Sequence, residues 1–200
     1  NSYRIPVNTS ATVFNLSAQG SIASLNFTLA PYNNDLFTKA KIQIYWDDSP
    51  IPAVDMSLGS FFGGGGDTIG SQDVSNKTFR NLFYGYDGSN PNGGTFYTYW
   101  PMPFWSHAKI VIVNNSTTDI TSFVSDVQYK TSSTLSYPNG QAGYFRARRT
   151  TDISSPNVPY STVFNETGRG KVVGLMFYSE GYAMDGDEFT YIDESSTPQI

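Results

Sequence analysis

The clearest pattern in the chain is an alternation of apolar and polar residues with a period of two. It is sharpest over residues 39–46, where the apolar positions are Ala40, Ile42, Ile44 and Trp46. This period is typical of a β-strand with one buried face, and a helical period is almost nowhere to be found. The same criterion predicts about ten strands, at residues 13–16, 22–29, 39–46, 79–86, 95–99, 109–113, 123–129, 144–149, 171–178 and 188–192.

Clusters of Gly, Pro, Asn and Asp separate these segments and predict turns. The clusters lie at residues 33–35, 63–66, 87–94, 138–140 and 154–159. Many short strands with irregular spacing favour an all-β fold, a jelly-roll β-sandwich with few or no helices. No internal boundary is convincing, so we expect residues 1–200 to form a single jelly-roll-type unit.

The composition narrows the classes of function. The formal charge of -5 argues against nucleic acid as a partner, because phosphate binding needs a basic face. No apolar run approaches the roughly 18 residues of a membrane span, so no membrane span is expected. The chain has no cysteine, which excludes disulfides, a thiolate nucleophile and a zinc-thiolate site.

The compartment is indicated by Asn-x-Ser/Thr sequons, which are acceptors for N-linked glycans in secreted proteins. A chain this rich in Asn, Ser and Thr should contain about three or four by chance. The sequons observed here begin at Asn8, Asn15, Asn26, Asn76, Asn114, Asn115 and Asn165. This excess favours a secreted, extracellular glycoprotein, and accident in a polar β protein is the alternative. Asn114 and Asn115 overlap, so we expect at most one of them to carry sugar.

Aromatic residues are dense at two places that are candidates for sugar contact. Residues 96–105 contain two closely spaced prolines, which should end a strand ladder and fix an extended corner. Phe61 and Phe62 stand beside a run of four glycines. The candidate sugar-contact residues are Phe61, Phe62, Trp100, Phe104 and Trp105. The alternative is that both groups are hydrophobic plugs under loops.

Two oxygen-rich loops are candidates for a calcium site, since calcium prefers carboxylate and amide oxygens. The first contains Asp47 and Asp48, and the second contains Asp87, Asn90 and Asn92. The alternative is that these side chains stabilise turns. No EF-hand spacing is present, and no other cofactor is indicated.

Two further side chains are candidates for chemistry. His107 is the only histidine, and without a strand-to-helix nucleophile elbow it favours a structural role over a Ser-His-Asp triad. Glu188 alternates with Thr190 and Ile192 on one face of a predicted strand, while Asp187 faces the other way. Glu188 could act as a general acid in an aromatic pocket. The alternative is a solvated or hydrogen-bonded structural carboxylate.

An ordered set of motifs spans the chain from about residue 20 to Ile200. It consists of Tyr45-Trp46-Asp47, Pro52-x-Val54, Leu58-Gly59-x-Phe61-Phe62-Gly63, Tyr99-x-Pro101-Met102-Pro103-Phe104, Gly143-Tyr144-Phe145, Gly168-x-Gly170, Val173-Gly174, and Glu180 through Gly186-Asp187-Glu188 to Ile192-Asp193. This set resembles the tandem jelly-roll family of the difructose-dianhydride synthase/hydrolase, an α-D-fructofuranosidase. The family also includes members that form extracellular filaments and tubules, some with calcium at subunit contacts.

The resemblance implies a tandem jelly roll and, in the enzymes, retaining chemistry by two glutamates. Glu188 matches the acid/base position, whereas Ser60 stands where the family's glycine loop usually has an acid. The family's nucleophile would follow the Thr-Pro-x-Ile that ends at Ile200. If Ile200 were the terminus, the chain could not form a glycosyl-enzyme, since this chemistry needs two carboxylates.

The sequence therefore predicts a non-catalytic, secreted, N-glycosylated subunit of an extracellular filament or tubule. Such a homo-oligomer or polymer would assemble through sandwich edges and loops, with calcium as a possible bridge. The alternative is a fructofuranosidase-type retaining hydrolase that uses Glu188. A sugar-binding module without catalysis is the third class.

Overall fold

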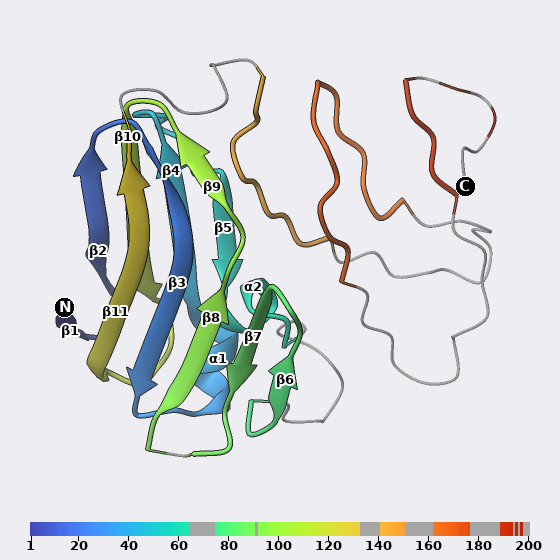
Figure 1. The fold of residues 1–200 in the computed structure, drawn as a ribbon. Helices are drawn as coiled ribbons and strands as arrows, with labels where there is room; N and C mark the ends of the chain where they lie inside the picture. Colours follow the sequence, from blue (N-terminus) through green and yellow to red (C-terminus); the bar gives the residue numbers. More distant parts are fainter. Residues whose placement is uncertain are drawn as a thin grey trace.

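The computed structural model describes residues 1–64, 75–90, 92–132, 141–150, 162–176 and 189–193, together with residues 195 and 197. In this part of the chain, eleven strands form two antiparallel sheets that pack face to face (Figure 1). The predicted all-β sandwich with few helices is confirmed. No helix in the described residues is both long enough and apolar enough to cross a membrane.

The large sheet follows the order β1-β11-β3-β8-β7-β6, and β9 pairs with β3 outside this path. Its strands are β1 (Ser2–Ile5), β3 (Gly20–Ala30), β6 (Thr78–Arg80), β7 (Tyr84–Asp87), β8 (Gly94–Thr98), β9 (Met102–Phe104) and β11 (Ile120–Thr131). The small sheet follows the order β2-β10-β4-β5. Its strands are β2 (Thr9–Ser17), β4 (Ala40–Trp46), β5 (Val54–Ser57) and β10 (His107–Asn114).

The core between the sheets is formed by the alternating apolar side chains of the strands, as expected. Every second side chain of β4 and β10 is buried, and Ile44 lies opposite Ile110 in the antiparallel register. The large sheet contributes Phe27, whose ring contacts the rings of Phe62 and Phe123. Each fully buried side chain of this size contributes about 1.5–3 kcal/mol of transfer free energy.

Two short helices occur in the described residues, and the first begins in the turn predicted at 33–35. Helix α1 (Asn34–Lys39) begins at Asn33, whose side chain accepts a hydrogen bond from the N–H of Leu36. Helix α2 (Leu58–Phe61) begins at Ser57, whose side chain accepts from the N–H of Ser60. Both side chains are N-caps that satisfy N–H groups left free at a helix start.

The prediction of a single strand over residues 79–86 is wrong. Strands β6 and β7 form a hairpin there, because Asn81 accepts hydrogen bonds from the N–H groups of Phe83 and Tyr84 and bends the chain. The prediction that the two prolines within residues 96–105 end the strand ladder is also wrong. Residues Met102–Phe104 pair with β3, since a strand with one partner tolerates proline where no N–H is required.

The strands predicted after β11 are not present in the described residues. Residues 144–149 form a single parallel bridge, between Ala147 and Val54, and are otherwise held by side-chain contacts. Residues 171–176 and 189–192 alternate in sequence but have no ladder partner among the described residues. The prediction of one unit over 1–200 and of a tandem arrangement therefore stays a prediction.

We predict that Phe62→Ala lowers the free energy of unfolding by about 3–5 kcal/mol, because it leaves a cavity between the sheets. Urea denaturation followed by tryptophan fluorescence measures this change. Phe83 is 40% exposed, so Phe83→Ala should cost less than about 1.5 kcal/mol. Equal losses in the two variants would contradict the placement of Phe62 in the core.

Candidate functional site

Asp47 lies where β4 ends, and its carboxylate organises the chain around it. Asp47 and Asp48 both have left-handed backbone, with φ of 49° and 60°, which aspartate tolerates better than most residues. The Asp47 carboxylate accepts hydrogen bonds from the N–H groups of Trp105, Ser106 and His107 at 3.0, 2.7 and 2.9 Å. One carboxylate thus fixes the corner between β9 and β10.

Tyr144 and Phe145, which are remote in sequence, add further contacts to Asp47 and Trp46. The hydroxyl of Tyr144 donates to the second carboxylate oxygen of Asp47 at 2.7 Å. The indole Nε1 of Trp46 donates to the carbonyl of Phe145 at 2.8 Å. We call Trp46, Asp47, Trp105, Tyr144 and Phe145 the Asp47 corner, which ties residues 144–147 to the end of the sandwich.

Burial and hydrogen bonding at the Asp47 corner shift the pKa values of Asp47 and Tyr144. Burial alone would raise the pKa of Asp47, but the N–H groups of His107 and Ser106, the hydroxyl of Tyr144 and the N–H of Trp105 together hold it below the usual 3.8. Burial, followed by the hydrogen bond to Asp47, raises the pKa of Tyr144 to about 12. At neutral pH a charged carboxylate therefore binds a neutral phenol.

Aromatic rings surround the Asp47 corner. The ring of Trp105 meets Tyr144 edge to face at 4.9 Å between centroids, and Phe145 meets Phe61 at 6.3 Å. Nε1 of Trp105 is buried and has no hydrogen-bond partner among the described residues. Buried polar groups are ordinarily paired, so this N–H indicates a partner that the described residues do not supply.

The candidate sugar-contact residues divide into two groups. Phe62 and Phe104 are fully buried, so the expectation that they contact sugar is wrong, and they act as core plugs instead. Phe61, Trp100 and Trp105 are half-buried. Trp100 stacks on Phe83 at 4.3 Å with an interplanar angle of 11°. These half-exposed rings are the ones that a sugar could reach.

The candidate calcium ligands are engaged by the protein itself. Asp87 accepts hydrogen bonds from Ser89 and Thr78 and pairs with Arg80, and these donors hold its pKa well below the usual value. Asn90 accepts from the N–H of Asn92. Among the described residues, no group of three or more His, Cys, Asp or Glu side chains could hold a metal ion. The geometry favours the turn-stabilising alternative for both loops.

His107 links the Asp47 corner to β2. Its Nδ1 contacts a carboxylate oxygen of Asp48, and its Nε2 lies 2.6 Å from Oδ1 of Asn15. The imidazole thus bridges β2 and the loop after β4. This geometry agrees with the structural role favoured by the sequence.

The sequons differ in accessibility. Asn114 is buried, and its Nδ2 donates to the carbonyls of both Ile5 and Thr118. Asn115 is exposed, so it is the reachable member of the overlapping pair. The sequon asparagines that are exposed are Asn8, Asn15, Asn76, Asn115 and Asn165. Asn26 is half-buried in the middle of β3.

Glu188 lies outside the described residues, as do Asp185 and Asp187. The described carboxylates of Asp35, Asp55, Asp87 and Asp119 are each held by hydrogen bonds within the protein.

The fold and the motif order define a β-sandwich related to glycoside hydrolases. Residues 1–127 match the GH172 domain-like family, and the chain therefore belongs to that family. A comparison with curated proteins finds no match. The family match supports the resemblance to the difructose-dianhydride synthase/hydrolase type, and it covers nearly all of the described sandwich.

Sequence reasoning missed the pairing of Asp47 with Tyr144. Both residues stand in the ordered motifs, but 97 positions separate them and no periodicity joins them.

We predict that Asp47→Asn lowers stability at pH 7 by about 1–3 kcal/mol, because an amide oxygen cannot replace two charged acceptors. The pKa of Asp47 is depressed in the folded state, so its stabilisation is present above 3.8 and is lost as pH falls through the folded pKa. The variant should therefore lose less stability than the wild type on acidification. Denaturation series at several pH values measure this difference.

Asp48→Asn is the matched control, since Asp48 is exposed and His107 is its one ion-pair partner in the part of the chain that the structure describes. It should change stability at pH 7 by no more than about 1 kcal/mol. If Asp47→Asn had the same small effect, the account of the Asp47 corner would be wrong.

Proposed function

We propose that the chain belongs to a retaining glycoside hydrolase of the fructofuranosidase type, in which the sandwich positions the sugar and Glu188 is the general acid/base. The observation that carries this proposal is the Asp47 corner. It fixes residues 144–147 against half-exposed aromatic rings at one end of the family-matched sandwich.

The aromatic surroundings suit a furanose or pyranose ring. Sugars present C–H faces that pack on aromatic rings, and Phe83 and Trp100 offer a stacked pair that is partly open to solvent. The buried N–H of Trp105, in the Asp47 corner, has no acceptor among the described residues. These features support binding of a neutral, hydroxyl-rich ligand at this end of the sandwich.

The chemistry needs a second carboxylate about 5–5.5 Å from Glu188, because a retaining enzyme forms a covalent glycosyl intermediate. In the resemblance this nucleophile is a glutamate on the stretch that follows Thr197-Pro198-Gln199-Ile200. Glu188 would protonate the leaving oxygen and then activate water for the second step. The proposed scheme gives no catalytic role to the acids of the described sandwich.

We predict that Glu188→Gln reduces fructose release from aryl or oligomeric fructofuranosides by at least about 100-fold, since the acid/base would be lost. The assay measures released fructose with the protein secreted by its natural host, wild type against variant. A substrate whose leaving group has a low pKa should restore the rate of the first step in the variant. A merely structural role of Glu188 would not produce this rescue.

Glu166→Gln is the control, because Glu166 pairs with Arg148 at 2.5 Å and is offered no catalytic role. Its activity should stay within about threefold of the wild type, a barrier change below about 1 kcal/mol. Activity that survives Glu188→Gln undiminished would overturn the assignment.

The edge of the small sheet favours a second candidate, a secreted structural subunit of a filament or tubule. Strand β2 spans Thr9–Ser17 and, among the described strands, pairs only with β10, so its other edge presents a long row of backbone groups to which another copy could bind. N-glycans on the exposed sequons and calcium between loops would belong to this extracellular assembly.

We predict for this candidate that Thr12→Lys on β2 blocks assembly, because an outward lysine opposes edge pairing. Light scattering and negative-stain microscopy measure the mass and shape of the assembly. Thr95→Lys on β8 is the matched control and should leave assembly intact, because Thr95 is exposed but pairs with β3 on one side and β7 on the other. A monodisperse wild-type monomer would refute this candidate, and an assembly unchanged by a chelator would refute the calcium contact.

A further inference from the structure

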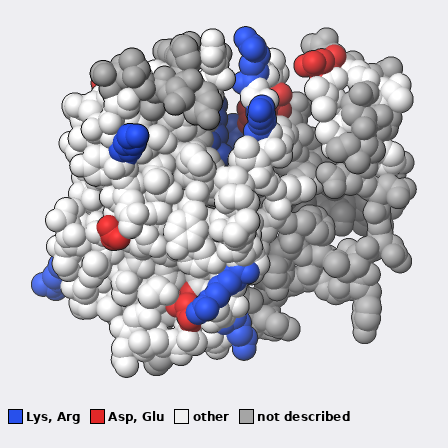
Figure 2. Space-filling view, in the orientation of Figure 1, with Lys and Arg blue, Asp and Glu red and all other residues white. Residues whose placement is uncertain are grey.

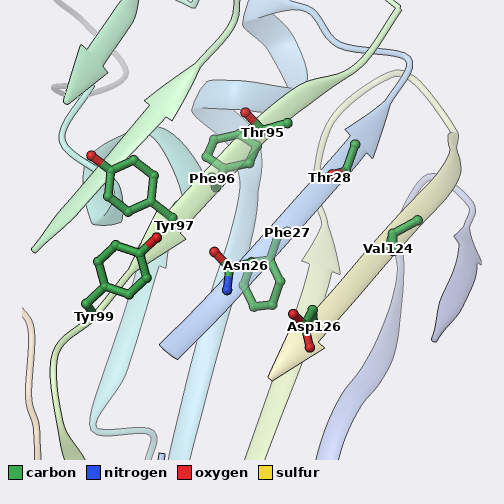
Figure 3. Close-up of a pocket in the computed structure, with 9 residues that line it drawn as sticks. All are labelled: Asn26, Phe27, Thr28, Thr95, Phe96, Tyr97, Tyr99, Val124 and Asp126. Carbon is green, nitrogen blue, oxygen red and sulfur yellow. The ribbon is translucent and has the colours of Figure 1, made fainter. Parts of the chain in front are cut away.

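The outer face of the large sheet has a hollow that the proposed active site does not use. Its volume is about 350 Å³, within the range of about 300–1,000 Å³ typical of small-molecule sites. The outward side chains that line it are Asn26, Thr28, Thr95, Tyr97, Tyr99, Val124 and Asp126 (Figure 3). Over this sheet the surface shows isolated charges separated by wide neutral areas (Figure 2).

The hollow contains a complete sequon. Asn26 and Thr28 are two residues apart on β3, so both side chains point to the outer face while Phe27 points into the core. The register places Tyr97 of β8 opposite Asn26 on one side and Asp126 of β11 opposite it on the other. Asn26 is therefore the centre of a row of outward side chains.

Two tyrosines form a wall beside Asn26. The rings of Tyr97 and Tyr99 lie 5.2 Å apart with an interplanar angle of 36°, and Tyr99 is 49% exposed. Figure 3 shows both rings on the side of Asn26 away from Asp126. The hydroxyl of Tyr97 donates to the carbonyl of Asn81, which fixes that ring in place. The wall is thus partly preorganised for a flat, weakly polar face.

We propose that Asn26 carries an N-linked glycan whose first N-acetylglucosamine lies in this hollow, against Tyr97 and Tyr99. In the transfer, Nδ2 of Asn26 forms a bond to C1 of the sugar and loses one proton. The bond from C1 to the diphosphate of a polyprenyl-diphosphate-linked oligosaccharide breaks, and the polyprenyl diphosphate leaves. Nδ2 has a single long contact, 3.4 Å to Oγ of Ser24, so little is lost on modification.

The environment of Asn26 differs from that of the exposed sequons. Asn76 and Asn165 are exposed, so their glycans should extend into solvent. At Asn26 the sugar's C–H face can pack on the tyrosines, and Asp126 offers an open acceptor to its hydroxyls. The glycan would cover the outer face of the large sheet and prevent association through it. This proposal rests on secretion and does not depend on the hydrolase assignment.

The test uses the full chain secreted from a glycosylating eukaryotic host. Glycopeptide mass spectrometry should find sugar on Asn26. An endoglycosidase should trim native protein at least about tenfold more slowly at Asn26 than at Asn76 or Asn165, and equally fast after denaturation. Asn26 without sugar in protein that is glycosylated elsewhere would overturn the proposal, as would equal trimming rates in the native protein.

A second comparison separates the packing of the sugar from its attachment. Tyr99→Ala should leave Asn26 glycosylated but make its glycan as easy to trim as that of an exposed sequon. Tyr129→Ala is the matched control, since Tyr129 is 47% exposed on the same sheet outside the hollow. Continued protection in Tyr99→Ala would contradict the role of the tyrosine wall. Capture of a free oligosaccharide by a hollow with unmodified Asn26 would also overturn the proposal.

Discussion

The account depends on one electrostatic constraint, the satisfaction of the Asp47 carboxylate. A charge at the end of β4 is stable only if donors surround it, and the N–H groups of residues 105–107 and the hydroxyl of Tyr144 do so. Because the donors come from two distant segments, the same charge sets the path from β9 into β10 and the position of residues 144–147. The aromatic rings gather around that fixed point.

This arrangement links the described sandwich to the proposed chemistry. The family match covers residues 1–127, whereas Glu188 lies well beyond it. In the proposed scheme the sandwich would position the sugar and would not itself supply the acid/base. The Asp47 corner fixes residues 144–147 beside the aromatic rings that would receive the sugar. The hollow beside Tyr97 and Tyr99 lies on the outer face of the large sheet, and the glycan proposed for Asn26 would shield that face.

The sequence predicted the parts of the fold that depend on local alternation. Strands β4 and β10 were clear because one face of each is buried, but the hairpin at Asn81 was hidden within an apparently continuous strand. Phe62 and Phe104 resembled sugar contacts because composition does not distinguish a buried ring from an exposed one. The pairing of Asp47 with Tyr144 could not be predicted, since tertiary packing alone brings them together.

The most direct test of the central claim is the titration of the Asp47 carboxyl carbon by NMR, with the Tyr144 ring followed in the same samples. A carboxylate held by backbone donors and a half-buried phenol should titrate below 3.8, and Tyr144 should titrate near 12. An Asp47 midpoint at or above 3.8, with Tyr144 near its ordinary value of 10, would contradict the account.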